Sequence, residues 1–328
     1  MLTESLFRAL AEPTRLRILR LLEEMELAIG ELAQVLDQSQ PRVSRHVAIL
    51  CDAGLVERRR EGSWVFLRAK SSDQEGNPLA AAAARLLAIA EREDAAFGTQ
   101  CAVDRKQLEA IRRGREDNAG AYFARHASDW DDLRKLHSPD EAVERTLIKA
   151  MADSPLGDLL DVGTGTGRMA ELFAPRADRI VALDKSLEML KLARAKLQHL
   201  PAERVELVQG DFTNLPFPAG RFSTVLLHQV LHFAHDPSRA INEAARVTGG
   251  GGRIVVIDFA AHEREELRER YAHVRLGFTD AMMTRMFRQA GFAERDTFDL
   301  HGGELVVKIW IGEKLQTSVR AADTKASA

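Results

Sequence analysis

The second half of the chain alternates apolar, β-rich runs with helical stretches, and this alternation limits the possible folds more than any other feature. The apolar runs cover residues 159–162, 180–183, 205–208, 224–227 and 254–257. Strands separated by helices form βαβ units, whose parallel sheet is covered by helices on both faces. Two later runs, 296–300 and 305–311, are placed to pair antiparallel through a short turn. The sequence therefore predicts an α/β domain.

The first seventy residues instead combine short helices with a hairpin. Apolar residues at helical spacing predict helices over 14–22 and 29–36. A third helix starts at Ser39 as N-cap, with Pro41 in its first turn, and ends at Gly54. Its buried stripe is Val43, Val47 and Leu50, and a β-hairpin over 55–67 follows. This order of elements is that of a winged helix-turn-helix, whose second helix lies in the major groove of DNA.

Polar and basic side chains cluster on the predicted reading helix and on the hairpin. The side chains expected to contact DNA are Ser39, Gln40, Arg42, Ser44, Arg45, His46, Arg58 and Arg60. Residues 39–70 contain seven Lys and Arg against three acids, a net charge of +4, whereas the whole chain has a net charge of −3. Phosphate contacts need such a local excess of positive charge. The sequence therefore predicts a local DNA-binding patch on a protein that is not a polycation.

Residues 9–19, 39–46 and 53–56, followed by the hairpin, resemble the ArsR/SmtB family of winged-helix repressors. The resemblance covers about residues 1–70 and implies a homodimer on a palindromic operator. The arsenic-sensing members carry Cys-Val-Cys just before the helix-turn-helix, where this chain has Ala28, Ile29 and Gly30. Without thiolates at these positions we expect no soft-metal site there. The signal that controls DNA binding is therefore expected to come from elsewhere in the chain.

Length and composition are those of a two-domain globular protein. The chain has 328 residues with 45% hydrophobic and 29% charged side chains, and we expect it to be cytoplasmic because it shows neither a secretory signal nor a long apolar run. Its two cysteines do not make a disulfide framework. The predicted parts are a winged helix-turn-helix over 1–70, a helical linker, dimerisation and pocket-cover segment over 71–136, a ligand-binding α/β domain over 137–312, and a disordered tail over 313–328.

The predicted helical segment is expected to be broken into pieces by Gly98, Gly114 and Gly120. Apolar residues of this segment are available to bury against a partner subunit, namely Leu86, Leu87 and Ile89.

The first predicted strand of the α/β domain runs into a glycine-rich turn. Residues 159–162 are followed by Gly163, Thr164, Gly165, Thr166 and Gly167, and a helix opens at residue 168. Glycines let a backbone approach a ligand closely. An acid follows each of the next two strands, Asp184 and Asp211, where a carboxylate can accept from ribose hydroxyls or an adenine amino group, or can cap the following turn.

Together with Leu215–Phe217 and Phe222–His228, these motifs resemble class I S-adenosylmethionine-dependent methyltransferases of the small-molecule branch. The resemblance covers about residues 120–312. It implies a Rossmann-like seven-stranded fold with its last strand antiparallel, and a site for S-adenosyl-L-methionine or S-adenosyl-L-homocysteine. The residues expected to bind this ligand are Asp161, Gly163, Thr164, Gly165, Gly167, Asp184, Lys185, Met189, Gly210, Asp211, Phe212, His228 and Tyr122. Tyr122 and Trp130 either close over the ligand or only pack the domain junction.

No residue is assigned a catalytic role from the sequence. The candidate bases are His228, His232, His262 and His273. The spacing of His228, His232 and His235 suggests a metal, but no thiolate or carboxylate set completes a site, and we expect no metal. The base-amino methylase motif is absent at 228–231, and two distant cysteines do not suit arsenite methylation.

Two functions therefore remain open at this stage. The whole chain resembles S-adenosylhomocysteine-responsive ArsR-type regulators. That resemblance implies a repressor of methionine-cycle and S-adenosylmethionine-cycle genes whose methyltransferase-like domain is the sensor. The alternative is an active small-molecule methyltransferase with an autoregulatory helix-turn-helix.

Overall fold

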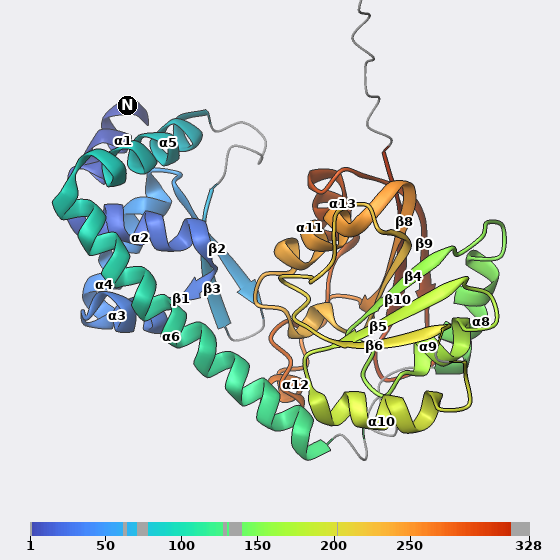
Figure 1. Cartoon of the computed structure of the whole chain (residues 1–328). Helices are drawn as coiled ribbons and strands as arrows, with labels where there is room; N and C mark the ends of the chain where they lie inside the picture. Colours follow the sequence, from blue (N-terminus) through green and yellow to red (C-terminus); the bar gives the residue numbers. More distant parts are fainter. Residues whose placement is uncertain are drawn as a thin grey trace, which may run out of the picture. The chain divides into compact units, whose positions relative to one another are not determined.

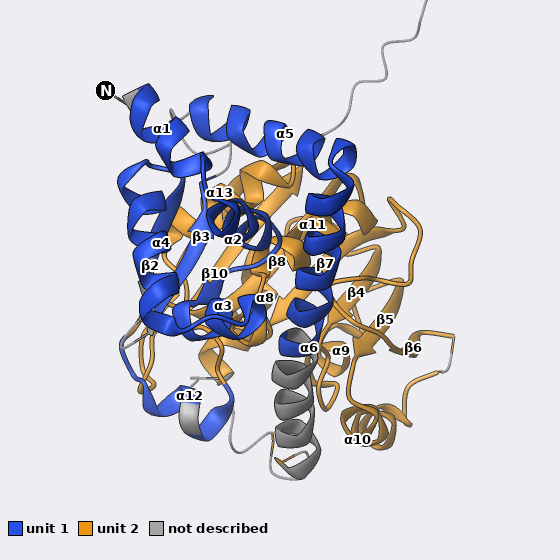
Figure 2. Ribbon diagram, turned by 90° about the vertical axis from the view of Figure 1, so that its left-hand side faces the viewer, with its two compact units in different colours: residues 1–121, 263–272 blue, residues 122–262, 273–328 orange. Residues whose placement is uncertain are grey.

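The computed structural model describes residues 2–61, 64–70, 78–126, 130, 140–201 and 203–315. The chain divides into two compact units, one of residues 1–121 with 263–272 and one of residues 122–262 with 273–328 (Figure 2). Residues 71–77 of the predicted linker, most of the pocket-cover segment after 126, and the tail from 316 lie outside the described residues. Within the described ranges, no helix is long and apolar enough to cross a membrane.

The first unit contains the winged helix-turn-helix together with two helices that follow it (Figure 1). Its elements are α1 (Leu2–Leu10), α2 (Pro13–Glu24), β1 (Leu27–Ala28), α3 (Ile29–Leu36), α4 (Gln40–Asp52), β2 (Val56–Glu61), β3 (Trp64–Ala69), α5 (Pro78–Glu93), α6 (Ala95–His126) and α12 (Glu266–Tyr271). The strands form a three-stranded antiparallel sheet in the order β1-β3-β2. The helices and the hairpin predicted from the sequence are confirmed.

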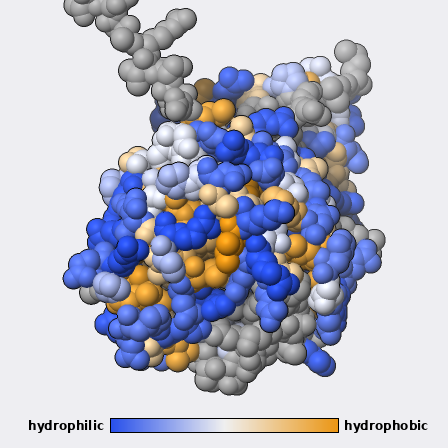
Figure 3. Space-filling view, turned by 90° about the vertical axis from the view of Figure 1, so that its right-hand side faces the viewer, coloured by the Kyte–Doolittle hydropathy of each residue, from blue (hydrophilic) through white to orange (hydrophobic). Residues whose placement is uncertain are grey.

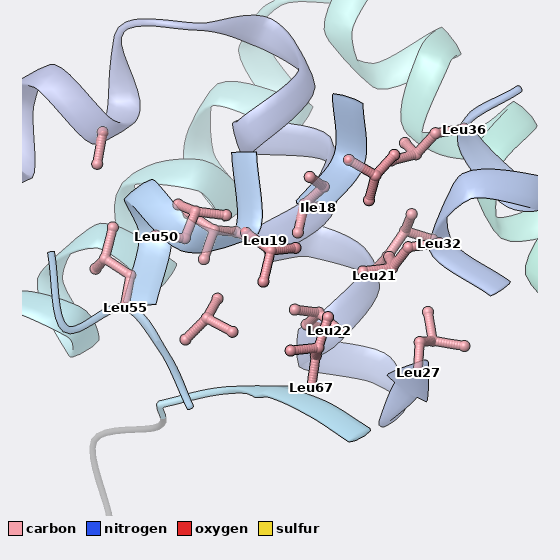
Figure 4. Close-up of a cluster of buried hydrophobic side chains, with 14 of the residues drawn as sticks. Ile18, Leu19, Leu21, Leu22, Leu27, Leu32, Leu36, Leu50, Leu55 and Leu67 are labelled. Carbon is pink, nitrogen blue, oxygen red and sulfur yellow. The ribbon is translucent and has the colours of Figure 1, made fainter. Parts of the chain in front are cut away.

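One apolar core holds this unit together (Figure 4). Ile18 and Leu22 of α2 meet Leu32 of α3, Leu50 of α4 and Leu67 of β3, and each of these side chains is buried. Leu87 of α5 belongs to the same core and is 3% exposed. The expectation that Leu87 faces a partner subunit was therefore wrong, because its own subunit already covers it.

The long helical segment is divided at Asp94 and not at the three glycines. The Asp94 carboxylate accepts hydrogen bonds from the backbone N–H groups of Ala96 and Phe97, so it caps the start of α6. Gly98, Gly114 and Gly120 all lie within α6. At Gly98 a Cβ atom would lie 2.5 Å from the carbonyl oxygen of Glu91. This glycine therefore allows the end of α5 to pack closely against α6. The prediction that the three glycines break the helical segment was wrong.

The second unit is a seven-stranded sheet with helices on both faces. Its elements are α8 (Asp140–Ala150), β4 (Asp158–Val162), α9 (Arg168–Phe173), β5 (Arg179–Asp184), α10 (Leu187–Leu197), β6 (Val205–Gln209), β7 (Phe222–His228), η2 (Leu231–Phe233), α11 (Pro237–Val247), β8 (Thr248–Phe259), α13 (Asp280–Gln289), β9 (Phe292–Leu300) and β10 (Val307–Lys314). The strand order is β6-β5-β4-β7-β8-β10-β9. Only β10 runs antiparallel to its neighbours, as the sequence predicts.

The helices bury the two faces of this sheet. Helices α11 and α13 pack on one face, and α8, α9 and α10 lie on the other (Figure 1). On the outer face drawn in Figure 3, hydrophilic side chains surround smaller hydrophobic patches. In open α/β sheets, ligands bind at the carboxyl ends of the strands, where the strand order reverses. In this unit that position lies where β4 and β7 end.

Candidate functional site

The predicted reading helix α4 has one buried and one exposed face. Val43, Val47 and Leu50 are fully buried, whereas Gln40, Arg42 and Arg45 are exposed and Ser44 is half-buried. Ser39 occupies the N-cap and is exposed, but its side chain makes no capping hydrogen bond. Helix α4 therefore presents amide, guanidinium and hydroxyl groups that can bond base edges and phosphates.

One other predicted contact on α4, His46, is placed differently from this exposed face. The His46 imidazole is 14% exposed and lies 3.4 Å from the Glu12 carboxylate, so it faces α2. Arg68 pairs with Glu57 and Glu26, and Glu57 is one of the three acids already subtracted in the net charge of residues 39–70. Arg58 on β2 is exposed, and the side chain of Arg60 lies outside the described residues.

The glycine-rich turn after β4 is shaped by left-handed backbone conformations. Gly163, Gly165 and Gly167 have φ values of 69°, 55° and 85°. A Cβ atom on Gly163 would lie 2.3 Å from a methyl group of Val230, the residue that precedes η2. The Thr164 hydroxyl donates to the buried Asp161 carboxylate at 2.6 Å. The turn is therefore packed directly against the chain segment that leaves β7.

Asp184, at the end of β5, holds the same turn. Its Oδ2 accepts the Gly165 N–H at 2.8 Å, and its Oδ1 accepts the Ser186 N–H at 2.8 Å. Burial raises the pKa of this carboxyl group, and the backbone hydrogen bonds oppose that effect. Each carboxylate oxygen has a second lone pair, so Asp184 can also accept hydrogen bonds from a ligand.

The remaining predicted ligand contacts follow β5 and β6. Lys185 Nζ lies 3.0 Å from Asp211 Oδ2, and the backbone N–H and the hydroxyl of Thr213 donate to Asp211 Oδ1. Burial raises the pKa of Asp211, but these hydrogen bonds outweigh it and leave the pKa below its usual value. Met189 is buried in α10. Asp211 therefore lies beside Lys185 in a local turn.

Gly210 and Phe212 flank Asp211 on the two sides of this turn. Gly210 leaves no room for a side chain, because a Cβ atom there would lie 2.8 Å from Leu183. Phe212 is partly buried against the apolar core of the unit.

A second group of polar residues lies where β7 and β8 end. His228 is buried at the end of β7, and Gln229 follows it with a φ of 53° and 7% exposure. A left-handed residue other than glycine costs about 1–2 kcal/mol. His232 Nδ1 lies 2.8 Å from Oδ1 of Asp258, and the two side chains are 3% and 0% exposed. The structure therefore joins one of the four candidate histidines to a buried carboxylate.

Asp258 is not among the site residues predicted from the sequence. Its signal was present, because Asp258 is the single acid in the apolar run 254–259, as Asp161 is in the first strand. His262 and His273 join His232, Phe233 and Phe259 in one group of packed rings, which we call the histidine–aromatic cluster. Within the described part of the chain, no group of three or more His, Cys, Asp or Glu side chains is arranged to hold a metal ion.

Trp130 connects the glycine turn with this cluster. A Cβ atom on Gly165 would lie 3.5 Å from the Trp130 indole nitrogen, and the Trp130 and Phe233 rings are 6.1 Å apart. Trp130 therefore covers the turn from the side where a ligand would approach Gly165. The side chain of Tyr122 lies outside the described residues.

Comparison with known families agrees with this two-part organisation. Residues 12–58 match the family described as bacterial regulatory protein, arsR family, and residues 160–256 match the family described as methyltransferase domain. The chain thus joins an arsR-family helix-turn-helix domain to a methyltransferase domain with a Rossmann-like fold.

Individual relatives match one domain or the other. The chain is 34% identical over 145 residues to the demethylmenaquinone methyltransferase of Thermobifida fusca, covering 44% of this chain and 61% of that protein. It is 50% identical over 64 residues to the arsenical resistance operon repressor of Escherichia coli, covering 19% of this chain and 55% of that protein. The chain spans about three fifths of the length of the curated methyltransferases that it matches first. Among solved structures, the YcgJ protein of Bacillus subtilis is 21% identical with a TM-score of 0.46, covering 54% of this chain and 99% of that chain.

The close approach of Gly163 to Val230 makes a testable prediction. Gly163→Ala should lower the free energy of unfolding by about 1–2 kcal/mol for the left-handed backbone, and by about 1–3 kcal/mol more for the clash. Gly220→Ala is the matched control, because Gly220 has a φ of 71° but its nearest neighbour is 3.9 Å away. Denaturant unfolding of both variants measures how much free energy of unfolding each one loses. Equal losses in Gly163→Ala and Gly220→Ala would contradict the predicted clash. Adding Val230→Ala should recover part of the clash energy.

Proposed function

We propose that this protein is a DNA-binding transcriptional repressor of methionine-cycle genes whose methyltransferase domain binds an S-adenosyl ligand as its effector. The observation that carries the proposal is the presence, in one chain, of an arsR-family domain with an exposed polar reading helix and a methyltransferase domain with a glycine turn after its first strand. The relative at 50% identity is named as an operon repressor, which supports the sign of regulation. This function places the protein in the cytoplasm, where it has access to chromosomal DNA.

The residues at the glycine turn fit the S-adenosyl group. Among the residues that the structure describes, only Trp130 comes within 4 Å of the missing Cβ position of Gly165. Asp184 has lone pairs left for the two ribose hydroxyls, and Asp211 is placed to accept from the adenine amino group. When bound, S-adenosylmethionine supplies an activated methyl group, whereas S-adenosylhomocysteine lacks that methyl group and the positive charge on sulfur.

The physical route between ligand and DNA starts at Trp130. Trp130 follows α6 in the chain, and α6 is fixed within the first unit by a buried fork between Arg17 of α2 and Asp104, with both hydrogen bonds at 2.7 Å. A ligand that displaces Trp130 therefore acts on a helix that is bonded to the DNA-binding domain. Coupling of about 1–3 kcal/mol is typical of such effects.

The DNA contacts can be tested on α4. Arg42→Ala and Arg45→Ala should each weaken operator binding by about 1–3 kcal/mol if the guanidinium reads a guanine. Arg145→Ala is the matched control, because Arg145 is an exposed arginine on α8 of the second unit. Fluorescence anisotropy with labelled operator DNA measures the affinities. Wild-type affinity in both α4 variants would exclude these contacts.

The effector role is tested by operator affinity at saturating S-adenosylhomocysteine, at saturating S-adenosylmethionine and without ligand. We expect S-adenosylhomocysteine to change the affinity about 5–150-fold relative to the ligand-free protein. Asp184→Ala should abolish this response and weaken ligand binding in calorimetry, because the ribose hydroxyls lose their acceptor in a buried site. Asp296→Ala, an exposed acid on β9, should behave like wild type. Equal operator affinity in all three conditions would contradict coupling and favour the enzyme alternative.

We also propose a homodimer that is formed through α1 and α5. Phe7 of α1 is 64% exposed, and Leu86 and Ile89 of α5 are 54% and 48% exposed. The two helices lie side by side in both ribbon views (Figures 1 and 2). Exposed apolar side chains that form one patch are typical of a protein interface, and the proposal is that these three side chains form such a patch.

Leu86→Glu should convert the dimer to a monomer in analytical ultracentrifugation and weaken operator binding, because one reading helix would be lost from each complex. Leu187→Glu is the control, since Leu187 is 55% exposed but belongs to α10 of the second unit. A Leu86→Glu variant that sediments like wild type would place the interface elsewhere.

The second candidate function is an active small-molecule methyltransferase. It is favoured by one observation, the buried His232–Asp258 pair at the end of β7 and β8.

A further inference from the structure

The His232–Asp258 pair has a fixed orientation. Asp258 Oδ1 accepts from His232 Nδ1 at 2.8 Å and from the Phe259 N–H at 2.8 Å, and Oδ2 accepts the backbone N–H of His232 at 3.2 Å. These three hydrogen bonds hold the Asp258 carboxylate in one orientation relative to the His232 ring. The network therefore assigns the imidazole proton to Nδ1 and leaves a lone pair on Nε2. The described residues supply no hydrogen-bond partner to Nε2.

Flat apolar rings surround the pair. His273 lies 4.2 Å from the His232 ring and stacks on Phe259 at an interplanar angle of 19°. Phe233 contacts His232 at 4.0 Å, and Trp130 extends this layer to Gly165. Aromatic rings stack on flat molecules, so these side chains favour a planar aromatic ligand. Through Phe233 and Trp130, the His232–Asp258 pair is linked to the glycine turn where the S-adenosyl group would lie.

Gln229 adds a polar group to the same end of the sheet. It is nine-tenths buried and has a left-handed backbone, and its Nε2 has no hydrogen-bond partner among the residues that the structure describes. Buried amide groups are nearly always hydrogen-bonded, and strained residues cluster at functional sites. A polar ligand atom beside Gln229 would satisfy this amide.

We propose that His232 is the proton acceptor of a methyl-acceptor site for aromatic hydroxyl compounds, and that Asp258 positions it. The inference rests on S-adenosyl binding in the proposed function and adds an activity to it. The new bond forms between the acceptor oxygen and the methyl carbon as the S–CH₃ bond breaks, and that bond's electron pair stays on sulfur. The hydroxyl proton moves to His232 Nε2, the Asp258 carboxylate stabilises the resulting imidazolium through Nδ1–H, and water later takes the proton.

The surroundings of the pair favour a hydroxyl group over an amine. A phenol has a pKa of about 10 and needs a base to become a good nucleophile near neutral pH. A neutral amine carries its own nucleophilic lone pair, so it has less use for a fixed base than a hydroxyl group does. The titratable and charged groups around His232 are Asp258, His273, His262 across Phe259, and Arg275, whose guanidinium donates to the carbonyls of Ala234 and His235. The positive charge of Arg275 suits an acceptor that becomes an anion.

The test uses the full-length protein, methyl-labelled S-adenosylmethionine, and two pairs of probes: 2-naphthol with catechol, and aniline with benzylamine. Wild type should methylate a phenol. His232→Asn keeps a nitrogen that can donate to Asp258 and removes Nε2, so it should lower kcat about 10²–10⁴-fold. His199→Asn, at an exposed position, is the control.

Two readouts separate a catalytic role from a structural one. Calorimetry should give the same S-adenosylhomocysteine affinity for wild type and His232→Asn. In ligand-free protein, ¹⁵N NMR should show the proton of His232 on Nδ1 in wild type and redistributed in Asp258→Asn.

Each remaining outcome decides between the two proposals. If wild type binds S-adenosylhomocysteine but methylates no phenol, or methylates only the amines, the inference is overturned and the proposed function stands. Wild-type kcat in His232→Asn would overturn it as well. Failure to bind either S-adenosyl ligand would overturn the proposed function itself.

Discussion

The close approach of Gly163 to Val230 is the constraint on which the ligand-binding edge of the second unit depends. Because Gly163 has no Cβ, the turn after β4 packs against the residue that leads from β7 into η2. The same turn is tied to β5 by the hydrogen bond from Gly165 to Asp184. The ends of three neighbouring strands are thereby fixed together. The positions of His232 and Trp130 follow from this arrangement, since both lie on segments packed around the turn.

Buried charge has different uses in the two units. In the first unit, Arg17 and Asp104 fix the long helix α6 to α2, and an ion pair of this kind stabilises only because the two side chains satisfy each other. In the second unit, Asp258 is fully buried beside an imidazole that can change its charge. The Arg17–Asp104 ion pair is suited to transmit a movement of α6 to α2. The His232–Asp258 pair is suited to accept a proton.

Several features of the fold could be predicted from the sequence, and others could not. The parallel βαβ organisation of the α/β domain follows from the local alternation of apolar runs and helices, whereas the strand order came only with the structure. The boundaries of α3 follow equally directly, because its periodicity and flanking residues are local signals. The break at Asp94 was missed because glycine at 98 serves a contact with the previous helix, which is not a local property. Leu87 was assigned to the wrong surface for the same reason, since helical periodicity does not say which apolar face meets which neighbour.

The sequence by itself determined the two domains, the reading helix and the glycine turn, because each depends on residues that are close together in the chain. Only the tertiary structure decided which histidine is paired with an acid. His232 and Asp258 are 26 positions apart and lie on different elements, and no periodic pattern connects them. Their contact exists because β7 and β8 are neighbours in the parallel sheet, so that the segments leaving the two strands meet at one edge.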